Sequence, residues 1–445
     1  MATPNKVHLT VDNTGIVQFK PQTAETAAKT SELLQENHEK HHIFFNKDGF
    51  HNHIVHHLLT LYGLGAPAEI IEQRYKENVN YQRDIIQSGA RPDMSDPENF
   101  KQYLDNEKYY HEYLIFWQNE MEKKGWENVL NEYVFAGDER ADGLLGRFYG
   151  GFLHPIIHLG FGIEFHQPAI IAEALAQACC HQNWTGEFLL AAEKDSKSRA
   201  STSSKTIPEL LDEIRANKKL STAAEWSDPN KIRDGVIARA SDEMLKYTSE
   251  WHVTPENLEQ KTAEMINSCI YYTAAAQNPP KQVKIDFYFM HCVNSSIFWP
   301  TFNAQPWLST ANKVRLLQWK GYLDLAMYAS RRSPPLLVSE ITDYAPAKPK
   351  EADWEGVFTR LFAFEDDGHA VKLGRAVRNG ELVSKAWEGK GEEVERGMKV
   401  KGDMWGKIGN MAIDSVEDSG VHWARSVGFA EAWVEYGDRS KKSQL

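Results

Sequence analysis

The chain has 445 residues, of which 42% are hydrophobic and 25% are charged, and its formal net charge is −12. This length is sufficient for a large buried core, and the composition is typical of a globular protein. The acidic charge argues against a nucleic-acid partner, because phosphate binding requires a cluster of Lys and Arg residues. Residues 143–165 are the most apolar stretch, but Arg147, His154 and Glu164 interrupt it, so we interpret it as a buried helix and not as a membrane span.

Cysteine usage and the first residues of the chain bear on its compartment. Only four cysteines occur, and no two have CxxC spacing. We therefore expect neither a disulfide framework nor a thiolate zinc site. The first 19 residues are polar and contain no apolar signal core. Together these features predict a cytoplasmic protein, and they leave its oligomeric state open.

The expected elements are almost all helical. Residues 7–19 (VHLTVDNTGIVQF) contain two β-prone runs joined by a turn signal, which predicts a short N-terminal β-hairpin within an arm of residues 1–20. Later segments have helical spacing and begin near Pro, Ser, Asp or Asn. The clearest are residues 67–83, 106–124, 207–218, 255–277 and 306–330. No βαβ alternation is visible. The sequence predicts an all-α fold with a single large multi-helical domain over residues 1–445.

Histidine is concentrated near the N-terminus: seven of the 17 histidines lie within residues 38–57. The first three, His38, His41 and His42, have polar neighbours, and we expect them at a solvated helix end. The others begin HNHIVHHLLTLYGLGA, a segment that is apolar nearly all round and therefore predicts a buried helix. His53 and His57 are four residues apart, so their rings project from one face, a spacing that can hold a metal ion.

Two further segments place histidines in apolar helices. HPIIHLGFGIEF repeats the four-residue spacing at His154 and His158. Pro155 favours the first helical position, which makes His154 the expected N-cap. IDFYFMHCVNSSIFW contains His291 alone in a strongly apolar helix. Any one buried histidine is more often a hydrogen-bonded core residue than a ligand. Several helices that each bury histidines favour a shared metal ion, because unpartnered polar rings are costly to bury.

The segment DDGHAVKLGRAV predicts a helix that starts near Asp366 and places His369 and Lys372 on one face. Imidazoles without thiolates suit iron, copper, zinc or nickel. An all-imidazole Fe(II) site lacks an anionic ligand, and Lys372 can supply one. Beside a divalent cation its amine is expected to lose its proton, and a neutral amine can add carbon dioxide to form a carbamate. The alternative is that Lys372 reaches the surface or pairs with Asp366 or Asp367.

A flavin-dependent mechanism is the competing interpretation. Residues 148–154 (FYGGFLH) fit F-x-G-x-x-x-H, the core of the fingerprint of Baeyer–Villiger monooxygenases. Those enzymes bind FAD and NADPH phosphates at glycine-rich βαβ turns. No G-x-G-x-x-G follows a predicted strand in this chain, so we interpret the match as chance.

Four segments together, HNHIVHHLLTLYGLGA, HPIIHLGFGIEF, DFYFMHCVNSSIFW and DDGHAVKLGRA, resemble the questin oxidase family of fungal secondary metabolism. The resemblance spans residues 51–375. It implies an oxygenase that opens the central ring of an anthraquinone, an aromatic polyketide, to give a benzophenone carboxylic acid. The family is often described as NADPH-linked and of Baeyer–Villiger type. Without a flavin fingerprint, non-haem Fe(II) with dioxygen as co-substrate fits this sequence better, and a need for NADPH stays open.

The resemblance also implies the site residues. In order of preference, the implied metal ligands are His291, His158, Lys372, His53, His154, His369 and His57. Lys372 and His369 are also assigned to catalysis, and no substrate-binding residue is identified. A non-enzymatic alternative is a helical scaffold or carrier for an apolar ligand, with a structural zinc ion bound by the same histidines.

Overall fold

The computed structural model describes residues 1–87, 89, 92–199, 205–417 and 420–439. The chain is mostly helical, and the described residues contain no strand beyond isolated β-bridges such as that between His41 and Asp84. The prediction of an all-α fold is confirmed. No helix in the described part of the chain is both long enough and apolar enough to span a membrane.

The predicted N-terminal hairpin is wrong. Residues 7–19 form an irregular segment whose N–H groups bond to helices. The His8 N–H donates to Gln167 Oε1 at 2.9 Å, and the Leu9 N–H donates to Ser31 Oγ at 2.8 Å. The two β-prone runs therefore do not pair with each other. Val7, Leu9 and Val17 are buried, whereas Val11 and Ile16 are exposed, so the alternation reflects partial burial of this segment and not strand pairing.

The chain divides into two compact units. Unit 1 comprises Met1–Glu187, Phe298–Asn312 and Phe362–Arg375, and unit 2 comprises Phe188–Ile297, Lys313–Leu361 and Ala376–Leu445. The expectation of one domain over residues 1–445 stays a prediction.

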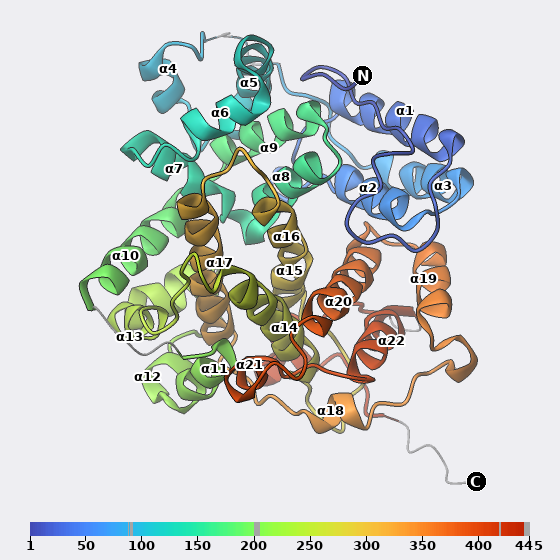
Figure 1. Ribbon diagram of the computed structural model, residues 1–445, viewed down its shortest axis with the longest axis vertical. Helices are drawn as coiled ribbons and strands as arrows, with labels where there is room; N and C mark the ends of the chain where they lie inside the picture. The colour runs from blue at the N-terminus through green and yellow to red at the C-terminus, as the bar shows by residue number, and fades with distance from the viewer. Residues whose placement is uncertain (88, 90–91, 200–204, 418–419, 440–445) are drawn as a thin grey trace. The chain divides into compact units, whose positions relative to one another are not determined.

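Unit 1 contains the helices that carry most of the predicted site. Its elements are α1 (Ala24–Lys40), α2 (Ile54–Leu64), α3 (Ala68–Val79), α4 (Pro97–Gln102), η1 (Glu107–Tyr109), α5 (Tyr110–Lys124), α6 (Trp126–Tyr133), α7 (Glu139–Phe148), η2 (Gly151–Leu153), α8 (His154–Glu164), α9 (Pro168–Cys180), α16 (Phe298–Asn303) and the start of α20 (His369–Lys385). Helices α1, α2 and α3 pack together, and α8 packs against α2 and α9 (Figure 1).

Unit 2 contains the remaining helices. They are most of α10 (Trp184–Arg199), α11 (Ile207–Ala216), α12 (Lys218–Ser221), the π-helix η3 (Lys231–Ile237), α13 (Ala238–Thr248), α14 (Leu258–Ala275), α15 (Phe287–Ser296), most of α17 (Thr310–Ser330), α18 (Ser339–Thr342), η4 (Pro349–Glu351), most of α19 (Trp354–Ala363), the end of α20, α21 (Glu392–Gly397), α22 (Met404–Glu417) and η5 (Ala430–Trp433). The helices predicted for residues 207–218, 255–277 and 306–330 correspond to α11, α14 and α17.

Helices α2 and α8 form the core of unit 1, as their all-round apolar surfaces predict. Every residue of both helices is buried. Helix α2 ends at Gly65, whose φ of 77° is the left-handed conformation that commonly terminates a helix. Helix α8 begins at His154 itself, with Leu153 as its N-cap, so the predicted start is displaced by one residue.

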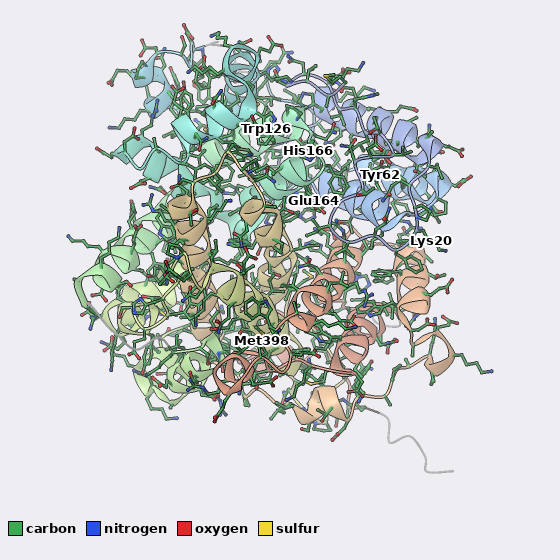
Figure 2. The ribbon with its side chains drawn as sticks, in the orientation of Figure 1. Lys20, Tyr62, Trp126, Glu164, His166 and Met398 are labelled. Atoms are coloured by element: carbon green, nitrogen blue, oxygen red, sulfur yellow. The ribbon has the colours of Figure 1, made fainter. Side chains whose placement is uncertain are left out.

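A buried ion pair fixes the far end of α8. Glu164, labelled in Figure 2, accepts hydrogen bonds from both terminal nitrogens of Arg375, one of them Nη1 at 3.2 Å. The Ile16 N–H donates to the same carboxylate at 2.7 Å. Both charged side chains are 1% exposed. The carboxylate of Glu164 is therefore bound by arginine and backbone at the end of the helix opposite to His154.

Removal of the Glu164 carboxylate should destabilise unit 1 strongly. A buried arginine that loses its partner leaves an uncompensated charge, which costs about 3–5 kcal/mol. Glu164→Ala is therefore expected to lower the midpoint of urea denaturation, followed by circular dichroism. Glu132→Ala, which removes an exposed ion pair with Lys124, is the control and should leave the midpoint nearly unchanged. Equal midpoints for the two variants would contradict this account.

Candidate metal centre

Three predicted ligands converge in unit 1. His53, His154 and His369 are all buried, and one potential ligand atom from each lies within 4.8 Å of the others. The rings come from equivalent places, because His53 is the N-cap of α2 while His154 and His369 are the first residues of α8 and α20. The Nε2 atoms of His53 and His154 are 2.8 Å apart. Three helix starts thus bring together nitrogens that are far apart in the sequence.

The Nδ1 atom of each of these three rings is hydrogen-bonded to a group outside the cluster. Asp367 bridges two of the rings: its Oδ2 accepts from His53 Nδ1 at 2.8 Å, and its Oδ1 accepts from His369 Nδ1. His154 Nδ1 donates to the Gly151 carbonyl oxygen at 2.6 Å. Carboxylates and carbonyls at this position are the usual second partners of metal-bound histidines, because they fix the tautomer and orientation of the ring.

These hydrogen bonds determine whether Nε2 of each ring carries a proton or a lone pair. Since Nδ1 carries the proton in His53 and His154, Nε2 of each neutral ring carries a lone pair. Two lone pairs 2.8 Å apart repel each other unless a cation lies next to both. The three imidazoles are therefore able to hold a metal ion, and ligands of this type suit iron or zinc.

The loop before α20 is shaped to position His369. Asp366 accepts from the N–H groups of Gly368 at 2.7 Å and Ala370 at 2.9 Å. Gly368 has a φ of +88°, and a Cβ atom there would lie 2.6 Å from a ring carbon of His57. Both observations require glycine at position 368, between Asp367 and His369.

Burial and neighbouring charges shift the pKa values in this region. Burial, together with the positive charge of Lys372, lowers the pKa of His53 and of His57 to about 3. Burial alone would raise the pKa of Asp367, but His369 and His53 outweigh it and hold that pKa well below its usual range. For Asp366, burial and the charge of Asp367 raise the pKa to about 7. The buried rings are thus held in the neutral form that can bind a metal ion.

Lys372 lies on α20 three residues after His369, and its side chain is buried. Its amine forms no ion pair with any residue that the structure describes, so direct pairing with Asp366 or Asp367 does not occur. Burial lowers the pKa of Lys372 to about 8, against the opposing effect of the two aspartates. The alternative that Lys372 reaches the surface or forms an ion pair is therefore wrong.

Three of the histidines predicted as ligands are not part of the three-histidine cluster. His158 lies one turn after His154, but its Nδ1 faces His56 Nε2 at 3.1 Å and its Nε2 faces Glu173 Oε2 at 2.7 Å. His57 packs against Gly368, and its Nδ1 has no hydrogen-bond partner among the described residues. Both rings lie in unit 1.

His291 lies in unit 2, on α15, where its Nδ1 donates to the Phe287 carbonyl at 2.6 Å. Its role as a metal ligand stays a prediction, which the metal content of His291→Ala would test.

The expectation of a solvated end for the early histidines is wrong for two of them. His42 is fully buried, and His38 is 6% exposed. His38 Nδ1 donates to Glu173 Oε1 at 2.6 Å, so this glutamate joins His38 to His158. Burial would raise the pKa of Glu173, but its hydrogen bonds with His158 and His38 outweigh burial and lower that pKa to about 2.

Sequence patterns do not identify two carboxylates that contact the candidate site, Asp367 and Glu173. Asp367 was considered only as a partner of Lys372, although its position two residues before His369 suits a carboxylate that holds the ring. Glu173 was not considered. Its signal is a single carboxylate in the otherwise uncharged helix PAIIAEALAQACC, where every residue from Ala169 to Cys180 is buried. An isolated buried charge in such a helix indicates a specific partner.

Asp367→Asn should weaken metal binding without unfolding the protein. The amide cannot accept hydrogen bonds from both rings. Loss of such a partner typically lowers metal affinity about 10–100-fold, and a decrease of that size is expected here. Titration of the metal-free protein with Co(II), followed by visible absorption, measures the change. Glu120→Gln is the control, because Glu120 is a buried carboxylate that pairs with surface lysines. Equal affinities for the two variants would mean that Asp367 does not position the ligands.

Comparison with known proteins places this site in a family. A model of the questin oxidase-like family matches residues 50–377. The chain is 38% identical over 436 residues to a Baeyer–Villiger monooxygenase of a Cryptosporiopsis species, covering 96% of this chain and 97% of the relative. It is 34% identical over 442 residues to a questin oxidase of Aspergillus terreus, covering 98% of each chain. The chain therefore belongs to the questin oxidase-like family, as its four histidine-containing segments predict.

Proposed function

We propose that this protein is an oxidoreductase that cleaves a C–C bond in the central ring of an anthraquinone, with dioxygen as co-substrate and a non-haem iron ion held by histidines. The observation that carries the proposal is the convergence of His53, His154 and His369, with Asp367 bonded to two of the rings. The relatives named questin oxidase and Baeyer–Villiger monooxygenase support an oxidative reaction on an aromatic polyketide in fungal secondary metabolism.

The donor set fits iron. His53 and His154 would hold the ion through their Nε2 atoms, which lie 2.8 Å apart, together with the ring of His369. Neutral imidazole nitrogens are ligands that suit iron. Bound Fe(II) would supply the one-electron chemistry that activates dioxygen.

The protein's own residues orient the histidine rings and exclude water from the point at which they meet. Asp367 and the Gly151 carbonyl fix the Nδ1–H tautomers, so the lone pairs of the ligands face one point. Burial of all three rings keeps bulk water from this point, which strengthens electrostatic interactions there. We assign His369 to catalysis only through this role as a ligand at the reacting centre.

We also propose that Lys372 carries a carbamate that binds the metal ion. The basis is a buried amine one turn along α20 from His369, with no ion pair to a described residue. The neutral amine attacks carbon dioxide, a C–N bond forms and one proton leaves, which gives an anionic oxygen ligand. That anion would offset part of the charge of Fe(II) bound to neutral imidazoles.

Elemental analysis and a dioxygen-dependent assay test the oxygenase proposal together. Protein purified without added metal is expected to contain about one iron per chain, and the iron-loaded form should consume dioxygen with an anthraquinone or its reduced quinol. Chelation should abolish this reaction, and Fe(II) should restore it. Tightly bound zinc with no response to dioxygen would instead support a structural zinc scaffold or carrier.

Lys372→Arg tests the carbamate. Arginine keeps the positive charge but cannot add carbon dioxide, so this variant should lose both metal and activity. Lys372→Ala should regain part of both with added bicarbonate or a small carboxylate. The mass of the intact native protein, measured with and without carbon dioxide, gives an independent readout. An active Lys372→Arg enzyme would rule the carbamate out.

A Baeyer–Villiger reaction linked to NADPH is the second candidate, and the names of several relatives favour it. In that reaction an oxygen atom is inserted beside a carbonyl group and NADPH supplies two electrons. Labelling with ¹⁸O₂ distinguishes the two. Ring cleavage by a dioxygenase places both labelled atoms in the products, whereas a monooxygenase places one in the product and the other in water, with one NADPH consumed per turnover.

A further inference from the structure

A second network of buried polar side chains extends from the three-histidine cluster through unit 1. It contains His56 on α2, His158 on α8, Glu173 on α9 and His38 on α1, and each of these side chains is at most 6% exposed. It ends at Gln118 on α5, whose Nε2 is 3.0 Å from His38 Nε2. Four contacts between successive side chains, from 2.6 to 3.1 Å, connect the members.

Donor and acceptor roles follow from the central carboxylate. An ionised glutamate can only accept, so both His158 Nε2 and His38 Nδ1 must donate to Glu173. A neutral His158 that donates through Nε2 has its lone pair on Nδ1. His56 Nε2, 3.1 Å from that nitrogen, must then be the donor. The carboxylate therefore sets the position of the proton on two rings in succession.

His56, the last ring of this network, lies beside the rings of His53 and His154. The centroid of His56 is 5.7 Å from that of His53 and 6.2 Å from that of His154. Phe161 stacks on His56 at 5.4 Å with an interplanar angle of 19°. His56 Nδ1 has no hydrogen-bond partner among the described residues. Within the described part of the chain, the contact with His158 is therefore the hydrogen bond that holds this ring.

We infer that Glu173 is a positioning residue of the metal centre: its carboxylate fixes the Nε2–H tautomers of His158 and His56 and so holds His56 as a neutral ring against the ligands His53 and His154. This inference rests on the proposed metal site. A ring in a defined tautomer packs in one orientation, and its N–H points to His158. Loss of the carboxylate removes the reason for that orientation, and the ligand rings that pack on His56 lose a fixed neighbour.

Nitrogen NMR of the histidine rings tests the tautomers directly. Protein labelled with ¹⁵N-histidine and loaded with diamagnetic Zn(II) should show neutral His56 and His158, each protonated at Nε2. Signals are assigned from the losses in His56→Gln and His158→Gln. Protonation at Nδ1 of either ring in the unmodified protein would overturn the inference, and this result needs no Glu173 variant to fold.

Two variants then separate Glu173 from the rest of the network. Glu173→Met removes the acceptor with little change in length, so His158 should donate through Nδ1 to His56 Nε2 and both tautomers should invert. His38→Phe leaves the carboxylate in place and should leave both tautomers unchanged. If Glu173→Met keeps the Nε2–H forms, or if His38→Phe inverts them, Glu173 does not set the tautomers.

Metal affinity supplies the functional readout. Glu173→Met should weaken Co(II) binding about tenfold and alter the visible spectrum of the bound ion, as expected when a group that orients ligands is lost. Glu120→Gln changes another buried carboxylate, one that pairs with surface lysines, and it should have no effect. Unchanged Co(II) affinity in Glu173→Met would overturn the positioning role. Failure of the unmodified protein to bind Co(II) would instead overturn the proposed metal site, while the tautomers would still be read from the metal-free form.

Discussion

The bridge that Asp367 makes between His53 and His369 is the interaction on which the site depends. A single carboxylate accepts one hydrogen bond from each of two rings that lie 316 residues apart, at the starts of α2 and α20. Without it, neither ring would have a defined tautomer, and their lone pairs would not face the same point. The backbone before α20 is arranged for this purpose: Asn78 donates to the Asp366 carbonyl at 3.1 Å, and Arg74 donates to the Phe364 carbonyl at 3.2 Å. Helix α3 thus fixes the loop that contains Asp367.

Sequence patterns predicted the helices well, because their apolar surfaces have helical spacing and their starts carry recognisable residues. They also predicted His53, His154 and His369 as ligands. The patterns could not show which ring of each pair faces the cluster. His57 and His158 lie four residues after members of the cluster, but His57 packs against Gly368 and His158 contacts Glu173 on α9. Such choices depend on tertiary contacts.

The errors have the same origin. His38 and His42 have polar neighbours in the sequence, yet both are buried, because the packing of α1 and the adjacent segment and not the local composition decides exposure. The N-terminal segment alternates like a strand, but its N–H groups donate to the side chains of Ser31 on α1 and of Gln167, the N-cap of α9. Glu173 was overlooked because a carboxylate 15 residues from His158 has no sequence relation to it, although an isolated charge in an apolar helix is itself a signal.

The location of His53, His154 and His369 at helix starts has an electrostatic consequence. The first turn of a helix carries about half a unit of positive charge, since its N–H groups have no partner within the helix. Three such turns, from α2, α8 and α20, surround the point at which the nitrogens meet. Their combined potential opposes a bare divalent cation and favours any anion that binds beside it. A site of this kind gains affinity for metal when an anionic group enters with the ion, and it stabilises the ionised form of a phenolic hydroxyl.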